Sequence, residues 1–197
     1  VGVAMYGFRC VRREVVPKTG GGVIVANHQS HFDPVLIGLA CDRPLTYLAR
    51  ESLFRFPPFR WLIRFYQAVP VRRDGLGLDG LREIIRRLKR GEIVVVFPEG
   101  TRTPDGEVQE FQPGLMALVR KTKVPVIPVG FDGPYQIWSR NSRFPRPLGV
   151  VQMAFGEPLE PEEIAKFEER ELMAELHDRV KKLHAEARDE RNRRISR

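Results

Sequence analysis

The sequence predicts an α/β fold in which helices flank a mostly parallel central sheet and an amphipathic helix follows at the C-terminus. Short runs of β-forming residues alternate with helical patterns along the chain, as in a parallel sheet whose strands are joined by helices. Apolar runs such as Ile93–Phe97 contain no alternating polar residues, which is typical of a strand covered on both faces. These two observations together predict the fold class.

Six segments carry the pattern of strands, namely residues 22–27, 45–49, 67–71, 92–98, 124–130 and, as a sixth, 150–156. The helical patterns between them cover about residues 34–41, 57–66, 77–90 and 114–122. A further helix is predicted over about residues 170–190, because apolar residues recur there at spacings of three and four, at Leu172, Leu176, Val180, Leu183 and Ala187. We expect this helix to pack back on the domain and its basic end, residues 188–197, to fray.

The composition indicates one compact domain over residues 1–197. A chain of 197 residues with 42% hydrophobic residues can bury a core of its own. Cys10 and Cys41 show no metal-binding or redox spacing, so we expect free thiols. The net charge of +8 favours an anionic partner, which could be nucleic acid, a phosphorylated small molecule or an acidic membrane surface.

No membrane-spanning segment is expected. The chain contains no run approaching the roughly 18 to 20 apolar residues that a spanning helix needs. Residues 1–16 are amphipathic and lack a small-residue cleavage site, so a signal peptide is not predicted either.

Three polar clusters follow predicted strands, namely "NHQSHFD" at residues 27–33, "RRDG" at 72–75 and "PEGTR" at 98–102. The carboxyl ends of parallel strands lie along one edge of a sheet, and ligands of open α/β sheets bind there. We therefore expect the three clusters to converge on one pocket.

In the first cluster, His28 and Asp33 can meet only if a turn separates them. Pro34 favours such a turn, because a proline suits the first helical position and disfavours helical backbone in the residue before it. A carboxylate on one imidazole nitrogen would fix the tautomer and leave the other nitrogen free to take a proton from a hydroxyl. The alternative is a structural strand-to-helix turn in which Asp33 is the helix N-cap.

Two other chemistries are disfavoured in this cluster. Ser30 lacks the flanking glycines of a nucleophile elbow. His28, His31 and Asp33 have no further His or Cys ligand at a recognisable spacing, so we expect no metal.

The third cluster has the composition of a phosphate-binding loop. Gly100 lets the backbone approach a ligand, Thr101 offers a hydroxyl, and the planar fork of Arg102 matches two phosphate oxygens. The alternative is a turn in which Glu99 and Arg102 form a surface ion pair of little energetic weight.

The segments "NHQSHFD", "VPVRR", "FPEGTR" and "VPVIPV", in this order and at these separations, resemble the four motifs of the glycerolipid acyltransferases. The resemblance covers about residues 20–160. It implies that His28 is the general base and Asp33 its orienting partner. The reaction it implies is transfer of a fatty acyl group from acyl-CoA or acyl-carrier protein to the free hydroxyl of 1-acylglycerol-3-phosphate, giving phosphatidic acid, with no further cofactor.

The resemblance also implies a binding site for the acyl acceptor, a lysophospholipid, formed by Arg50, Arg73, Glu99, Gly100, Thr101 and Arg102, with the arginines holding its phosphate. Two positions depart from the family pattern. Gln67 stands where the second motif usually has glycine, and Gln112 stands where a basic residue commonly follows the third motif. Related acceptors such as glycerol 3-phosphate, another lysophospholipid or another alcohol therefore remain alternatives.

Residues 53–67 interleave aromatic and basic side chains, a composition suited to the headgroup boundary of a bilayer. The membrane-contact residues expected there are Phe54, Phe56, Phe59, Arg60, Trp61 and Arg64. The alternative is a core-packed helix with its arginines in water. We expect a cytoplasmic protein that is peripheral on the inner face of the membrane.

Two other function classes remain as alternatives to an acyltransferase. A nucleic-acid-binding module would need surface aromatics on a sheet or a basic recognition helix, and no such motif occurs. We therefore expect no nucleic acid partner. A lipid-binding relative without catalysis would be signalled by loss of His28 or Asp33, and both are present.

Overall fold

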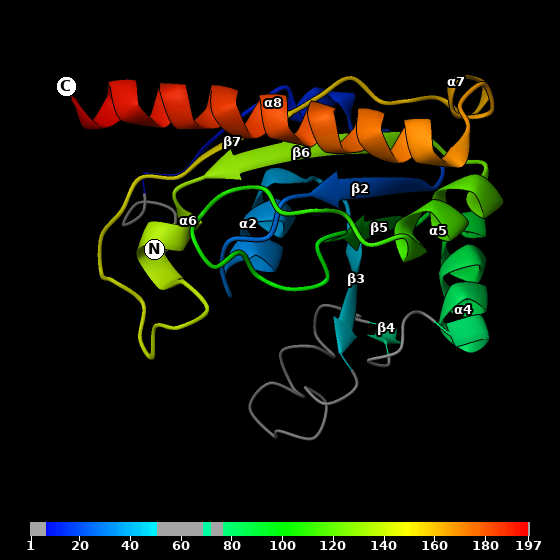
Figure 1. Cartoon of the computed structure of the whole chain (residues 1–197), viewed down its shortest axis with the longest axis horizontal. Helices are drawn as coiled ribbons and strands as arrows, with labels where there is room; N and C mark the ends of the chain where they lie inside the picture. Colours follow the sequence, from blue (N-terminus) through cyan, green and yellow to red (C-terminus); the bar gives the residue numbers. More distant parts are fainter. Residues whose placement is uncertain (1–6, 51–68, 72–76, 197) are drawn as a thin grey trace.

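The computed structural model describes residues 7–50, 69–71 and 77–196. Within these ranges, seven strands form one sheet in the order β1-β7-β6-β2-β5-β3-β4. All neighbouring strands pair in parallel except β6 and β7, which are antiparallel, so the predicted mostly parallel sheet is confirmed (Figure 1). The strands are β1 (Arg9–Val11), β2 (Gly22–Ala26), β3 (Leu45–Arg50), β4 (Val69–Val71), β5 (Ile93–Val96), β6 (Val126–Asp132) and β7 (Gln152–Phe155).

The helices agree with the predicted ranges wherever the structure describes them. They are a short 3₁₀ turn η1 (Arg13–Val15) and the helices α2 (Asp33–Ala40), α4 (Gly77–Lys89), α5 (Gly114–Thr122), α6 (Pro134–Trp138), α7 (Pro161–Ile164) and α8 (Glu169–Ile195). The predicted helix at 57–66 and the start of the predicted strand at 67–71 lie outside the described residues. The sequence did not predict β1, α6 and α7, because β1 contains no continuous apolar run and the helices α6 and α7 are too short to show a helical periodicity.

The sheet separates two apolar clusters. Val23 and Val25 of β2 point into a cluster with α4, α5 and α8. Ile24 and Ala26 of the same strand point into a second cluster with α2 and α6. All five residues of β2 are buried, which explains why its sequence is continuously apolar: helices cover both of its faces.

Helix α8 lies along β6 (Figure 1). A capping box between Glu168 and Glu171 starts the helix. A Cβ atom at Gly130 of β6 would lie 2.2 Å from the backbone nitrogen of His184, so glycine at this position allows the helix to approach the sheet.

The prediction that the basic end of this helix frays is wrong. Arg191 donates to the carbonyl oxygen of Val150 at 3.0 Å and pairs with the buried Asp132 at 3.1 Å. Arg194 donates to the side chain of Gln152 at 3.0 Å. The periodicity of apolar residues stops at Ala187, so it could not reveal a helical end held by arginines that bind β6 and β7.

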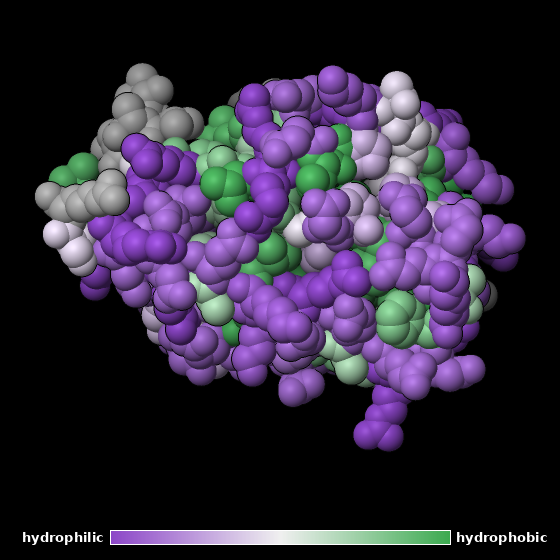
Figure 2. All heavy atoms as spheres, turned by 90° about the horizontal axis from the view of Figure 1, so that it is seen from above, coloured by the Kyte–Doolittle hydropathy of each residue, from purple (hydrophilic) through white to green (hydrophobic). Residues whose placement is uncertain are grey.

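The view onto α8 shows a mostly hydrophilic surface with apolar side chains in scattered groups (Figure 2). Among the residues that the structure describes, no helix is long and apolar enough to cross a membrane.

Candidate active site

The turn at residues 27–33, which we name the catalytic turn after the role predicted for His28, meets the "PEGTR" loop because β2 and β5 are parallel neighbours. His28 follows β2, and Phe97 and Glu99 follow β5. The backbone N–H of Thr103 donates to the carbonyl oxygen of His28 at 2.8 Å, and the N–H of His28 donates to the Glu99 carboxyl at 3.1 Å. The predicted convergence of these two clusters is therefore confirmed.

The structure brings His28 and Asp33 together through a turn, as the sequence predicted. The imidazole Nδ1 lies 2.7 Å from Oδ2 of Asp33. The same carboxyl oxygen accepts the backbone N–H groups of Gln29 at 2.6 Å and Ser30 at 2.7 Å. Burial raises the pKa of Asp33, whereas the His28 ring and these two N–H groups lower it. Asp33 is the first residue of α2 and Phe32 is its N-cap, so the carboxyl group ties the turn to His28 and does not cap the helix.

The His28 ring is fixed in place on one face. Phe97 stacks on it, with 4.2 Å between the ring centroids and 18° between the planes. The side chain retains 19% exposure. Since Nδ1 is bound to Asp33, Nε2 is the nitrogen that can receive a proton, and it has no hydrogen-bond partner among the described residues. The geometry suits a general base.

Glu99 lies against the backbone of the catalytic turn and is only 3% exposed. One carboxyl oxygen accepts from His28, and the other has no partner in the described part of the chain. Burial raises the pKa of Glu99 to about 8, with the nearby Asp33 adding to the rise and the His28 N–H opposing it. Glu99 is therefore largely protonated at neutral pH.

The "PEGTR" loop turns outward after Glu99. Gly100 has a positive φ of 68°, which glycine adopts without strain, and its N–H donates to the carbonyl oxygen of Phe97 at 3.1 Å. Gly100 and Thr101 are exposed, and Arg102 is half-buried. The backbone of Gly100 and Thr101 and the cationic side chain of Arg102 are thus partly accessible to a ligand beside His28, as the binding of a phosphate requires.

No role was predicted for His31, but the structure places its ring against the Arg102 guanidinium. The other neighbour is Trp138, whose ring centroid is 4.7 Å away. Burial and the Arg102 charge lower the pKa of His31 to about 4, so this ring is neutral at neutral pH. In the sequence, the only feature that could have indicated a role for His31 is its position three residues after His28.

Three further polar residues hold the catalytic turn. The Asn27 side chain exchanges two hydrogen bonds of 3.0 Å with the backbone of Phe131. The Gln29 amide donates to the carbonyl oxygen of Gly106 at 2.7 Å. The Ser30 hydroxyl donates to the carbonyl oxygen of Trp138 at 2.8 Å, so it is committed to structure. All three side chains are buried. The only feature of the sequence that could have indicated their structural role is that they form a polar run directly after a buried strand.

Other predicted site residues lie outside what can be described. Arg50 ends β3, but its side chain is not described, and Arg73 lies outside the described residues. The same holds for the six predicted membrane-contact residues, Phe54, Phe56, Phe59, Arg60, Trp61 and Arg64. Within the described ranges, no group of His, Cys, Asp and Glu side chains could hold a metal ion, and Cys10 and Cys41 are free thiols.

Comparisons with known proteins agree with this geometry. A family model described as "Acyltransferase" matches residues 7–132. The 1-acyl-sn-glycerol-3-phosphate acyltransferase of Bacillus subtilis is 29% identical over 90% of this chain and 88% of its own length. A chloroplastic 1-acyl-sn-glycerol-3-phosphate acyltransferase of Brassica napus is 30% identical over 70% of this chain and 40% of its own length.

A solved structure is similar over most of the chain. The crystal structure of the 1-acyl-sn-glycerophosphate acyltransferase PlsC from Thermotoga maritima superposes with a TM-score of 0.78 at 34% identity, covering 93% of this chain and 73% of that one. The fold, the paired histidine and aspartate and these matches lead to one conclusion: the chain belongs to the acyltransferase family, and it is an enzyme of that class.

Proposed function

We propose that this enzyme transfers a fatty acyl group from acyl-CoA or acyl-carrier protein to the free hydroxyl of 1-acylglycerol-3-phosphate, giving phosphatidic acid for phospholipid synthesis. The observation that carries the proposal is the His28–Asp33 pair, 2.7 Å apart, beside a loop that presents Arg102. The names of the similar proteins from Bacillus subtilis and Thermotoga maritima support the choice of acceptor.

The reaction begins with proton transfer at His28. Nε2 takes the proton of the acceptor hydroxyl while Asp33 holds the Nδ1 proton and stabilises the imidazolium. The alkoxide oxygen attacks the thioester carbonyl carbon, a C–O bond forms, and the C–S bond breaks. The thiolate leaves and receives the proton from His28. The products are the new ester and a free thiol, with no acyl-enzyme intermediate and no cofactor besides the acyl donor.

Arginines hold the acceptor phosphate in this proposal. Arg102 supplies a charged fork beside the exposed backbone of Gly100 and Thr101. Arg50 and Arg73 are proposed to complete the phosphate site, and Glu99 to support the loop. A different acceptor, such as glycerol 3-phosphate or another lysophospholipid, is the main alternative.

The same proposal places the enzyme on a membrane, peripheral on the cytoplasmic face. A lysophospholipid acceptor and its diacyl product reside in the bilayer. The net charge of +8 suits the anionic lipid of that face. The aromatic and basic residues between Phe54 and Arg64 are proposed as one contact.

The test is thiol release with purified protein. We expect His28→Ala to lose nearly all activity with unchanged circular dichroism, because no other group replaces the base. His177→Ala is a matched histidine control, because His177 lies on α8, where its ring packs against Phe111; this variant should retain activity. If His28→Ala turns over like the parent, the catalytic assignment is wrong.

An acceptor panel tests the substrate. It compares 1-acylglycerol-3-phosphate, glycerol 3-phosphate, other lysophospholipids and a non-phosphorylated alcohol, each with acyl-CoA and with acyl-carrier protein. The proposal requires the highest kcat/KM for 1-acylglycerol-3-phosphate. A preference for a non-phosphorylated alcohol would contradict it.

A further inference from the structure

The loop between α6 and β7, residues 139–151, exposes apolar side chains. Phe144 is 73% exposed and Leu148 is 71% exposed, the highest values among the exposed large hydrophobic residues that the structure describes. The guanidinium of Arg143 lies over the Phe144 ring, 5.5 Å from its centroid. Large apolar side chains that are exposed to solvent close together are typical of an interaction surface.

All charged side chains of this α6–β7 loop are positive. Arg140, Arg143 and Arg146 are all exposed, and no Asp or Glu occurs from Gly133 through Gly156. Exposed aromatic and aliphatic side chains interleaved with arginines match the headgroup boundary of an anionic bilayer. A purely polar anionic partner would leave the two apolar side chains without a function.

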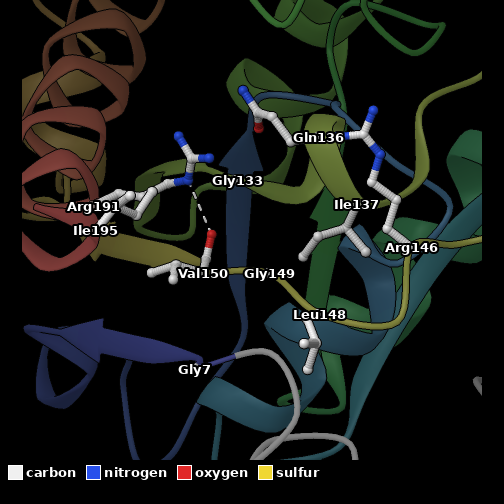
Figure 3. A pocket seen from close by; sticks show the side chains of 10 residues that line it. All are labelled: Gly7, Gly133, Gln136, Ile137, Arg146, Leu148, Gly149, Val150, Arg191 and Ile195. Carbon is white, nitrogen blue, oxygen red and sulfur yellow. Dashed lines mark hydrogen bonds between the residues drawn. The ribbon is translucent and has the colours of Figure 1, made fainter.

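The apolar surface continues into a hollow beside the loop (Figure 3). This hollow has a volume of about 620 Å³, and its lining includes Ile137, Arg146 and Leu148 on one side and Arg191 and Ile195 of α8 on the other. Ile195 is also exposed. An anionic lipid that meets the loop would thus find both apolar and cationic side chains.

Contacts attach the α6–β7 loop to the catalytic turn. Trp138, which precedes the loop, accepts the Ser30 hydroxyl on its carbonyl oxygen and packs against the rings of His31 and Phe32. Arg140 donates to the carbonyl oxygen of Arg102 at 3.4 Å. A surface that holds the loop therefore also positions the turn that carries His28.

We propose that the α6–β7 loop docks on an anionic lipid bilayer, with Phe144 and Leu148 in the headgroup boundary and the three arginines on lipid phosphates. The role of this contact, presenting His28 to a bilayer-borne acceptor, rests on the proposed function. The contact itself does not depend on that function, because it needs neither acyl donor nor acceptor. It involves a different segment of the sequence from the membrane contact proposed between Phe54 and Arg64.

The test is sedimentation of the full chain with vesicles free of substrates, made of phosphatidylcholine alone or with phosphatidylglycerol. We expect binding to the anionic vesicles that weakens with added salt. Phe144→Asp combined with Leu148→Asp should weaken it by about tenfold or more, since two apolar anchors become anions. Leu39→Asp is the matched control, because Leu39 is an exposed leucine on α2 and should bind like the parent.

A second measurement reports on the loop directly. Cys10 and Cys41 are replaced by Ala, and a polarity-sensitive dye is attached to Phe144→Cys or, as a control, to Leu39→Cys. Anionic vesicles should shift the emission of the dye at position 144 to shorter wavelength and leave the control unchanged. Equal vesicle binding by the double variant and the parent, or equal dye responses at both positions, would overturn the proposal.

These outcomes are distinguishable from a failure of the proposed function. If the loop proposal is correct, the double variant retains kcat/KM on a monomeric short-chain acceptor and loses activity only on vesicle-borne acceptor. If the enzyme proves inactive on 1-acylglycerol-3-phosphate, the substrate-free binding and dye measurements still decide the loop proposal.

Discussion

At the scale of single residues, His28 depends on two carboxyl groups in different ways. Asp33 contacts the ring at Nδ1, so in the proposed mechanism it determines the tautomer and balances the charge that forms during proton transfer. Glu99 contacts His28 through the backbone N–H and not through the ring. One acid therefore acts on the chemistry of the ring and the other on its position.

Glu99 gives the protein a predictable dependence of stability on pH. Its pKa rises from 4.5 to about 8 on folding, so between these values the native state binds more protons than the unfolded state and the free energy of unfolding falls as pH rises. Glu99→Gln removes this titration. We expect the variant to gain stability relative to the parent by up to about 1.4 kcal/mol per pH unit across that range.

Urea unfolding from pH 5 to pH 9 measures this difference. Near pH 5 both proteins should have similar stability, and the gap should widen toward pH 8. Parallel stability curves would show that Glu99 does not carry a raised pKa.

Arg102 is the residue through which the phosphate proposal can be tested most directly. Arg102→Ala removes a charge-assisted fork, so kcat/KM for the acceptor should fall by about tenfold to a hundredfold while KM for the acyl donor stays unchanged. Arg120→Ala is the control, because Arg120 is exposed on α5. An unchanged acceptor dependence in Arg102→Ala would remove this residue from the phosphate site.

At the scale of elements, α8 joins the sheet to the catalytic turn. Its Arg188 and Arg191 face the buried Asp132 at 3.6 and 3.1 Å. Asp132 ends β6, and its carboxyl also lies 3.5 Å from the Gln29 amide in the turn. The C-terminal part of the helix thus stabilises a strand end next to the site.

Removing Arg191 should cost stability even though it lies near the end of a helix. Arg191→Ala leaves the Asp132 carboxylate buried with only its more distant partners, Arg188 and the Gln29 amide, so we expect a loss of about 2 to 3 kcal/mol in the free energy of unfolding. Arg193→Ala on the same helix breaks only an exposed pair with Glu190 and should cost less than about 0.5 kcal/mol. Urea unfolding of both variants provides the comparison, and equal losses would contradict the role given to Arg191.

For the molecule as a whole, the sequence predicted the central architecture because the patterns that indicate strands and helices are local. Continuous apolar runs marked β2 and β5, and helical periodicity marked α4 and α8. The placement of "NHQSHFD" and "PEGTR" at one edge was also predicted, because the carboxyl ends of parallel strands lie together, whereas the direct pairing of β2 with β5 is a finding of the structure. Apolar runs and helical periodicity are set by residues close together in the sequence, so they can be recognised without the structure.

The remaining features depend on contacts between residues far apart in the sequence. Arg191 binds Asp132, 59 positions away, and no periodicity in α8 encodes that partner. His31 meets Arg102 across 71 positions, so its neutral state follows from burial that the sequence does not show. The short helix α6 matters because Trp138 lies against His31 and Phe32, not because of its own pattern.

Patterns in the sequence were therefore enough to predict the α/β class, the main strands and helices, and the His28–Asp33 pair with its neighbouring "PEGTR" loop. The folded structure was needed to show that Glu99 is buried and protonated at neutral pH, that α8 continues to Ile195, and that Phe144 and Leu148 are exposed on the α6–β7 loop. The physical reason is that propensity and periodicity are set by adjacent residues, whereas burial, pKa and exposure are set by whatever the fold places around a side chain.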